Sequence, residues 1–159
     1  MGIDRHPFGT TRDGQNVELF VLRSRHSMIA KISTWGGRIT ELHTPDRDGF
    51  SGDIVLGYDH LEPYLGDRAY LGALVGRYAN RIARGHFSID GTDFQVPLND
   101  GPNTLHGGPT GFDKVVWRAE PRDSEESPSL VLQHTSPDGE DGFPGKMDVT
   151  VVYCLTKDS

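Results

Sequence analysis

The chain has 159 residues and a formal net charge of −7, and both numbers limit what it can be. A chain of this length suits one domain, which buries roughly 70% of the surface of the unfolded chain. Nucleic-acid phosphates are bound by clustered lysine and arginine, so the acidic balance and the lack of a basic run argue against nucleic acid as a partner. No stretch approaches membrane-spanning length and residues 1–6 hold no apolar signal core, so no membrane association is expected.

The composition favours β structure in a reducing compartment. Hydrophobic residues make up 35% of the chain and there are 20 glycines, which is typical of turn-rich proteins built from short antiparallel strands. Cys154 is the single cysteine, so an internal disulfide is excluded and a cytoplasmic location is the expectation.

The first third of the chain predicts short strands joined by tight turns. Four runs are rich in β-branched and aromatic residues or alternate between polar and apolar ones. These runs are residues 17–22, 28–35, 38–42 and 53–56. The cluster Pro-Asp-Arg-Asp-Gly at residues 45–49 predicts a turn before the fourth of them.

The middle third predicts a hairpin followed by a long polar connection. Residues 61–75 have the most helix-like pattern, but a proline and two glycines break it into turns and short helical pieces. Residues 87–94 alternate on both sides of Asp90-Gly91, the dipeptide that favours a type I′ hairpin turn. Residues 97–110 form a long loop, and such loops on a sheet scaffold often hold binding groups.

The last third returns to strands, at residues 115–117, 130–133 and 147–155, with a polar hairpin tip at 122–129. Many short strands without a strand–helix–strand rhythm predict an all-β antiparallel sheet or sandwich. The last strand runs directly into residues 156–159, which read as the start of a turn without its return strand. A sheet cut there exposes a long unpaired edge, so we expect the chain to be a fragment of a longer protein.

Three motifs in the chain follow one another in a fixed order. Residues 76–85 read Gly-Arg-Tyr-Ala-Asn-Arg-Ile-Ala-Arg-Gly, residues 101–108 read Gly-Pro-Asn-Thr-Leu-His-Gly-Gly, and residues 111–117 read Gly-Phe-Asp-Lys-Val-Val-Trp. With Trp-Gly-Gly-Arg-Ile at 35–39 and Ser-Pro-Asp-Gly-Glu-Asp-Gly-Phe-Pro-Gly at 136–145, this order resembles the N-terminal half of the aldose 1-epimerases, the galactose mutarotases. The resemblance implies a large antiparallel β-sandwich, of which residues 1–159 are the incomplete N-terminal part of a single domain.

The same resemblance implies an isomerase that needs no cofactor and interconverts the α and β anomers of aldohexoses such as glucose or galactose. Mutarotation requires an acid and a base on opposite sides of the sugar. In the family these are a histidine in an Asn-His-Ser-type segment of the second half and a glutamate near the C-terminus, and neither segment is present here. We therefore expect little activity from this chain alone, and a non-catalytic carbohydrate-binding or regulatory module of the same fold stays open as the alternative.

His106 is the strongest candidate for a functional residue. Two glycines follow it, which allow a ligand to approach the backbone closely. The resemblance places His106 in the sugar site near the ring oxygen, as a catalytic and substrate-binding residue, and it implies that Asn80 and Arg81 bind sugar hydroxyls. We expect His106 and Arg81 to face one concave surface. The alternatives are a loop-stabilising histidine and a surface arginine paired with a carboxylate.

The remaining polar clusters are interpreted as structural. Asp113 and Lys114 are expected to support the fold, with the neighbouring aromatic residues in the core or at its rim. The acidic loop at residues 138–141 lacks the carboxylate spacing of a calcium loop and is expected to be a solvated turn. The histidines show no paired spacing, so no metal site is expected, and Cys154 is expected to be chemically inert.

Overall fold

The computed structural model describes residues 2–25, 27–66, 68–123 and 127–156, and strands are its dominant regular structure. The strands are β1 (Gly2–Thr10), β2 (Asn16–Arg23), β3 (Ile29–Ser33), β4 (Ile39–Pro45), β5 (Ser51–Asp53), β6 (Arg81–Ala83), β7 (His86–Ile89), β8 (Thr92–Gln95), β9 (Asn103–Leu105), β10 (Arg118–Arg122), β11 (Ser129–Ser136) and β12 (Met147–Cys154). The helical pieces are α1 (Leu61–Gly66) and the 3-10 turns η1 (Phe112–Lys114) and η2 (Glu140–Gly142).

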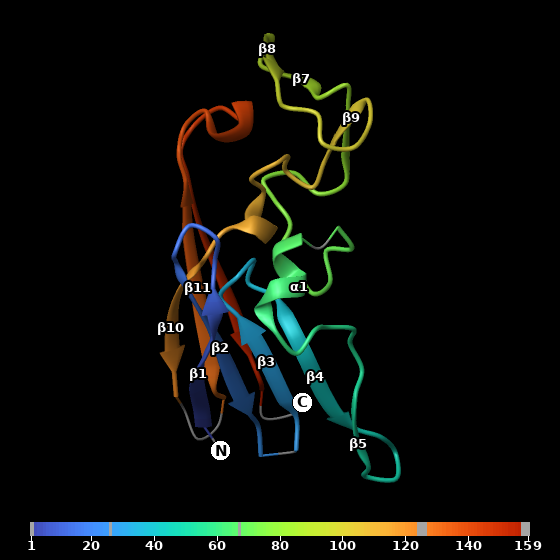
Figure 1. Cartoon of the computed structure of the whole chain (residues 1–159), viewed down its shortest axis with the longest axis vertical. Helices are drawn as coiled ribbons and strands as arrows, with labels where there is room; N and C mark the ends of the chain where they lie inside the picture. The colour runs from blue at the N-terminus through green and yellow to red at the C-terminus, as the bar shows by residue number, and fades with distance from the viewer. Residues whose placement is uncertain (1, 26, 67, 124–126, 157–159) are drawn as a thin grey trace.

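Two antiparallel sheets form the lower part of the molecule in Figure 1. One has the order β1-β2-β3-β4-β5 and the other the order β10-β11-β12. Their facing sides share one hydrophobic core, with Phe20 and Leu22 from β2, Ile32 from β3, and Leu130 and Leu132 from β11. Each such side chain stabilises the fold by about 1.5–3 kcal/mol when it leaves water. The prediction of an antiparallel β-sandwich is confirmed.

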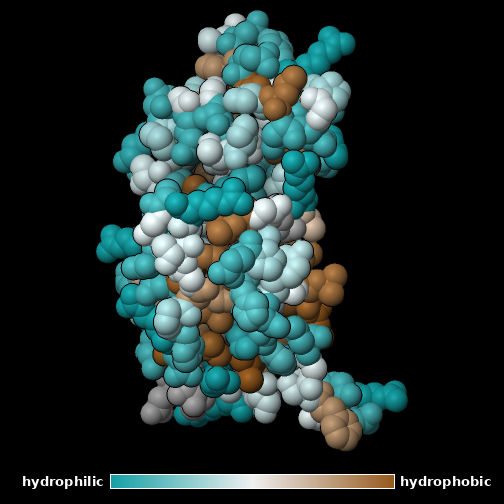
Figure 2. Space-filling view, in the orientation of Figure 1, coloured by the Kyte–Doolittle hydropathy of each residue, from teal (hydrophilic) through white to brown (hydrophobic). Residues whose placement is uncertain are grey.

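Two small two-stranded sheets, β6–β9 and β7–β8, extend beyond the sandwich at the top of Figure 1. They have a minor core of their own, in which Ile82, Val96 and Phe143 are buried and Phe87 packs against them. In Figure 2 this upper end is mostly hydrophilic, whereas hydrophobic side chains reach the surface in the middle of the lower part. The long connection predicted for residues 97–110 contains the short strand β9.

The hairpin predicted at Asp90-Gly91 is confirmed. β7 pairs with β8 in the register Ile89↔Thr92, which leaves a two-residue turn. Asp90 and Gly91 have φ angles of 50° and 79°, the two positive values that a type I′ turn requires.

The prediction of a strand at residues 53–56 is wrong. β5 ends at Asp53, and the side chains of Ile54 and Leu56 are 64% and 76% exposed. The Asp53 carboxylate explains the end of the strand, because its Oδ1 accepts bonds from the backbone N–H groups of Leu42 (2.9 Å) and Val55 (3.2 Å). A side chain that bonds nearby backbone in this way offers an alternative to ladder pairing.

The strand predicted at residues 115–117 begins later than expected. The chain first forms η1, Val116 makes only an isolated bridge with Trp35, and β10 starts at Arg118. Trp117 is 1% exposed, and its indole N–H donates to the Phe112 carbonyl at 3.0 Å. Residues 111–117 therefore bring aromatic side chains into the core, as the sequence predicted for the residues around Asp113.

β1 was not predicted, because its sequence is polar and does not alternate. It pairs with β2 and lies at the edge of the sheet, where Pro7 is tolerated beside a register shift. The helix-like pattern at residues 61–75 yields only α1, in agreement with the prediction of short pieces. Parts of the predicted hairpin tip (residues 124–126) and of the terminal turn (residues 157–159) lie outside the described residues.

Candidate functional site

The pairing of β6 with β9 brings Asn80 and His106 together. Arg81 lies opposite Leu105 in this register, so the residue before β6 meets the residue after β9. The His106 backbone N–H donates to the Asn80 carbonyl at 3.0 Å, and the Asn80 backbone N–H donates to His106 Nδ1 at 3.0 Å. Because Nδ1 accepts this bond, the neutral imidazole carries its proton on Nε2. Nε2 is therefore the atom that can donate to a ligand.

Asn80 and His106 both adopt left-handed backbone conformations, with φ angles of 67° and 51°. Such angles are uncommon outside glycine and persist where surrounding structure imposes them, often at functional sites. Here Gly107 provides part of that structure, because a Cβ built on it would lie 1.7 Å from the Gly76 carbonyl oxygen. Gly107 thus allows close packing of the chain against itself, rather than the approach of a ligand that the sequence suggested.

Arg81 is adjacent to this pair but is engaged on the surface. Its Nε donates to Asp100 Oδ2 at 2.7 Å, and its Nη1 lies 3.4 Å from Asn80 Oδ1. The Arg81 side chain is 54% exposed, so this ion pair contributes little to stability. An arginine that is not committed to the core can exchange such a partner for sugar hydroxyls, and the role predicted for Arg81 stays a prediction.

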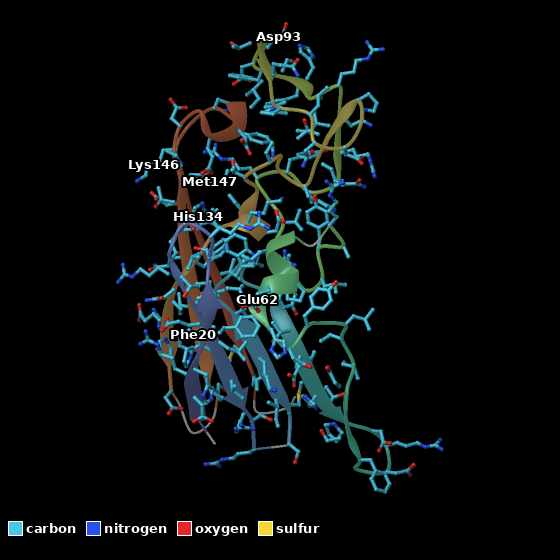
Figure 3. All side chains as sticks on the ribbon, viewed as in Figure 1. Phe20, Glu62, Asp93, His134, Lys146 and Met147 are labelled. Carbon is cyan, nitrogen blue, oxygen red and sulfur yellow. The ribbon has the colours of Figure 1, made fainter. Side chains whose placement is uncertain are left out.

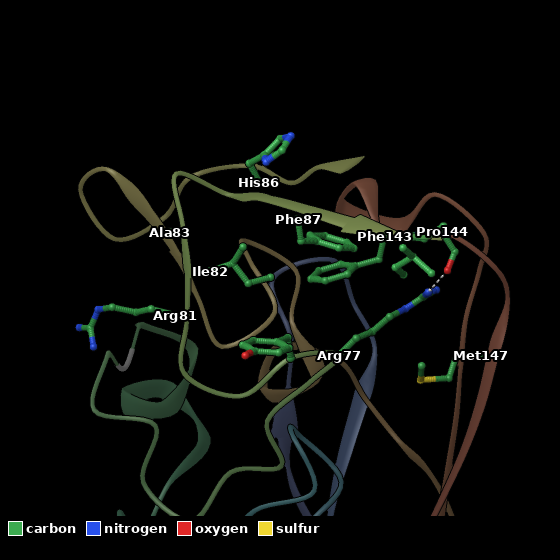
Figure 4. A pocket seen from close by; sticks show the side chains of 11 residues that line it. Arg77, Arg81, Ile82, Ala83, His86, Phe87, Phe143, Pro144 and Met147 are labelled. Atoms are coloured by element: carbon green, nitrogen blue, oxygen red, sulfur yellow. Dashed lines mark hydrogen bonds between the residues drawn. The ribbon is translucent and has the colours of Figure 1, made fainter. Parts of the chain in front are cut away.

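A cavity of about 570 Å³ lies beside these residues, and its lining is mostly apolar. Its lining residues are Arg77, Tyr78, Arg81, Ile82, Ala83, His86, Phe87, Ile89, Phe143, Pro144 and Met147. Figure 4 shows Phe87 and Phe143 stacked over it, while the Arg81 side chain points away. His106 does not line this cavity. The expectation that His106 and Arg81 face one concave surface is thus not met by this cavity, although the two residues are neighbours in the fold.

Arg77 lines the same cavity and forms a clamp, a set of hydrogen bonds from its guanidinium to residues 136–145. Its guanidinium donates to Ser136 Oγ and to the carbonyls of Ser136, Pro137, Pro144 and Gly145 at distances of 2.6–3.0 Å. These bonds tie residue 77 to the segment that carries η2, more than 50 positions away along the chain. Of the three neighbouring arginines at residues 77, 81 and 84, Arg77 is therefore the structural one.

The acidic loop at residues 138–141 is more ordered than a solvated turn. Asp141 Oδ2 accepts from the Thr110 backbone N–H at 2.8 Å and from its hydroxyl at 2.7 Å. Glu140 accepts a hydrogen bond from Ser136 Oγ, and Asp138 accepts one from the Gly145 backbone N–H. Asp141 thus ties this loop to the loop that follows His106, whereas Glu140 and Asp138 bond within their own segment. The sequence could not reveal the contact of Asp141 because its partner, Thr110, lies 31 positions away.

Tyr70 lies near His106 and was given no role by sequence reasoning, whereas Lys114 was expected only to support the fold. The Tyr70 ring lies 4.6 Å from the His106 ring at an interplanar angle of 69°. Lys114 Nζ lies 5.3 Å above the Tyr70 ring and 2.9 Å from the Asp113 carboxylate. Nothing in the sequence marks Tyr70, because the contact joins positions 36 residues apart.

A group of possible metal ligands lies elsewhere, on β4 and β5. One donor atom each from Glu41, His43 and Asp53 lies within 4.8 Å of the others, among the described residues. Histidine spacing could not reveal this group, because the register His43↔Asp53 assembles it. Glu41 is already engaged by Lys31 Nζ at 2.7 Å and by His43 Nε2 at 2.8 Å. Asp53 Oδ1 accepts from the backbone N–H groups of Leu42 and Val55, so each of the three residues already has a hydrogen-bond partner within the protein.

Cys154 is on β12 and is exposed, not buried in an apolar environment. Among the described residues, no helix has the length and apolar character that crossing a bilayer demands.

The sequence model of the aldose 1-epimerase family matches residues 18–159. The galactose mutarotase of Bos taurus is 46% identical over 156 residues, which cover 98% of this chain and 44% of that protein. The aldose 1-epimerase of Escherichia coli K12 is 37% identical over 147 residues, which cover 92% of this chain and 42% of that protein.

Solved structures agree with the sequence comparison. The crystal structure of galactose 1-epimerase from Lactobacillus acidophilus superposes with a TM-score of 0.84 at 27% identity, covering 98% of this chain and 45% of that one. An aldose epimerase homologue from C. elegans superposes with a TM-score of 0.78 at 31% identity. The chain spans less than half the length of the relatives it matches. By sequence and by fold, this chain belongs to the aldose 1-epimerase family.

Proposed function

We propose that this chain supplies part of the sugar site of an aldose 1-epimerase that interconverts the α and β anomers of an aldohexose such as glucose or galactose. Asn80, Arg81 and His106 are the proposed sugar-binding residues, and residues 1–159 are proposed to be one part of a single sandwich domain. The observation that carries the proposal is the bond from the Asn80 backbone N–H to His106 Nδ1. It leaves Nε2 as a fixed donor for a sugar oxygen.

The reaction moves two protons and breaks one bond. A base removes the proton of the anomeric hydroxyl as the bond from C1 to the ring oxygen breaks, and an acid protonates that ring oxygen. After rotation of the open-chain aldehyde, the same transfers run in reverse and close the ring. His106 Nε2–H is suited to bind or polarise the ring oxygen. No carboxylate of this chain matches the family's base, so the proposed activity belongs to a longer protein.

The partner that we propose is a free aldose, and the location that we propose is the cytoplasm. Asn80, Arg81 and His106 can donate hydrogen bonds, which fits a sugar because its ring oxygen and hydroxyls accept them. The single cysteine is consistent with a reducing compartment.

Polarimetry on freshly dissolved α-D-glucose tests the proposal. We expect the 159-residue chain to leave the rate close to that of buffer, because each missing acid or base is worth about 10²–10⁴-fold. A longer protein encoded by the same reading frame, with an Asn-His segment and a late glutamate, should accelerate equilibration. In that protein, His106→Ala should lower the rate by about 10²-fold or more.

Two results would contradict the proposal. The first is a stop codon directly after Ser159 in the genome together with sugar binding by the chain, which would favour a non-catalytic carbohydrate-binding module. The second is rapid mutarotation by the 159-residue chain alone, which would place the catalytic groups among residues that we assign to structure.

A further inference from the structure

We propose that Tyr70 is a positioning residue that fixes the orientation of the His106 imidazole, and that the buried Arg38 holds Tyr70 in place. The proposal rests on the proposed function only for its meaning in catalysis. It gives a role to the Trp-Gly-Gly-Arg-Ile motif at residues 35–39, to which the sugar site itself assigns none.

The contact between Tyr70 and His106 limits rotation of the imidazole. The two rings are 4.6 Å apart at 69°, within the range of favourable edge-to-face pairs. The Asn80 backbone N–H holds the Nδ1 side of the imidazole at 3.0 Å. A ring held at one nitrogen by a hydrogen bond and packed by a second ring has one orientation, so Nε2 points in a fixed direction.

A second contact of the Tyr70 ring is with Lys114. Its Nζ lies 5.3 Å above the Tyr70 ring, a cation–π distance, and 2.9 Å from Asp113. The Tyr70 backbone has a φ angle of 56°, a conformation that is maintained only where neighbours impose it. Lys114 and the backbone around Tyr70 together set the plane of the ring.

Arg38 connects the segment of Tyr70 to the segment of Lys114. Its side chain is 1% exposed. Nη1 donates to the Leu71 carbonyl at 2.9 Å, and Nη2 lies 3.4 Å from the Asp113 carbonyl and 3.8 Å from its carboxylate. One buried guanidinium thus joins the residue after Tyr70 to the residue before Lys114.

The backbone of the same motif reinforces this link. The Ile39 N–H donates to the Gly72 carbonyl at 3.0 Å, and the Leu74 N–H donates to the Gly36 carbonyl at 2.9 Å. A Cβ on Gly72 would meet the Ile39 carbonyl oxygen at 2.0 Å, so the two segments are in direct backbone contact. The loop that presents Tyr70 is therefore fixed to the turn between β3 and β4 and to the start of β4.

The test uses the 159-residue chain with ring-labelled histidine and compares Tyr70→Leu with Tyr70→Phe. Nitrogen NMR of His106 reports which ring nitrogen carries the proton, and hydrogen exchange of the Asn80 amide reports its bond to Nδ1. We expect Tyr70→Phe to keep the Nε2–H form. We expect Tyr70→Leu to mix the two neutral forms and to lower Asn80 protection about fivefold, the loss expected for one net hydrogen bond.

Tyr78→Leu is the matched control, because Tyr78 is 53% exposed and lines the apolar cavity. It should leave both His106 measurements unchanged. Lys114→Met is a second variant that spares the core, since the Lys114 side chain is 32% exposed. It should lower Asn80 protection about twofold, as the weaker of the two contacts.

Unchanged His106 tautomer and Asn80 protection in folded Tyr70→Leu or Lys114→Met would overturn the proposal. An equal change in Tyr78→Leu would do so too, because the effect would then be general loosening. None of these measurements uses a sugar. A longer protein without mutarotase activity would therefore defeat the proposed function while leaving the positioning of His106 supported.

Discussion

His134 is an ionisable residue placed among aromatic rings. Its ring lies 5.5 Å from Phe112 and 5.4 Å from Trp117, and Figure 3 shows it on the three-stranded sheet, above Phe20. Burial lowers the pKa of His134 below its ordinary value; Glu140 opposes this shift and Arg77 adds to it. The imidazole is therefore harder to protonate in the folded chain than in the unfolded one.

We predict that His134 makes the chain less stable as the pH falls from 7 toward 5. Between the lowered pKa of the folded state and the ordinary value near 6.5, the unfolded chain binds more protons, so the free energy of unfolding rises with pH. His134→Phe should flatten this dependence by less than one proton per molecule. Urea unfolding at several pH values measures it. His60→Gln, at an exposed position, is the control, and an unaltered slope in His134→Phe would refute the assignment.

Arg77 offers a second test at the scale of one residue. Arg77→Lys should lower the free energy of unfolding by about 2 kcal/mol, because one ammonium cannot replace the five directed bonds of the guanidinium. Arg84→Lys, at an exposed site, should stay within about 0.5 kcal/mol. Equal free energies of unfolding for the two variants in chemical denaturation would show that the Arg77 clamp does not stabilise the fold.

Candidate residues that stand in a short sequence motif could be named from the sequence, and residues that matter only through distant contacts could not. Asn80, Arg81 and His106 were found from short motifs, and β6–β9 pairing brings them together. Arg38 and Tyr70 were missed as contributors, because their importance comes from contacts 33–75 positions apart in sequence. The sugar-binding roles themselves stay predictions.

At the scale of elements, the β7–β8 hairpin depends on its turn. We predict that Gly91→Ala lowers the stability of this hairpin by about 1 kcal/mol, the cost of a left-handed conformation for a residue with a Cβ. No atom lies within 4 Å of the added methyl group among the described residues, so strain is the whole effect. Asp90→Asn keeps a type I′ sequence and should be neutral. Amide exchange in β7 and β8 distinguishes the two, and equal protection would contradict the turn assignment.

Strand prediction succeeded where an apolar run is buried in the core and failed where side chains bond the nearby backbone. The runs at residues 17–22 and 130–133 lie in β2 and β11, at the centre of the sandwich. The run at residues 53–56 looked equally strand-like, but the Asp53 carboxylate bonds the backbone N–H groups of Leu42 and Val55. Residues 2–10 form a strand because β2 offers them an edge, and no local pattern contains that information.

β12 lies at an edge of the three-stranded sheet. It pairs with β11 alone in its sheet, and Val152 on it is 55% exposed. Exposed edges of this kind invite pairing with other chains. We predict that Val152→Lys lowers self-association, measured by light scattering at rising concentration, without lowering stability.

Ser88→Lys is the matched control for this edge, because it adds the same charge on the exposed strand β7. The chain carries a net charge of −7, so one added lysine by itself weakens the repulsion between molecules. A reduction confined to Val152→Lys therefore identifies the edge. Equal scattering by both variants would show that β12 does not drive association.

The pairing of β6 with β9 separates His106 from the β7–β8 turn, where extra residues can be inserted. The hydrogen bonds between Asn80 and His106 lie at one end of the β6–β9 pair. The β7–β8 hairpin lies beyond the other end (Figure 1). Residues added at Asp90-Gly91 would lengthen a surface loop, at an entropic cost that grows only slowly with length. The hairpin tip is thus the natural place to insert a reporter peptide or fluorophore that leaves the geometry at His106 undisturbed.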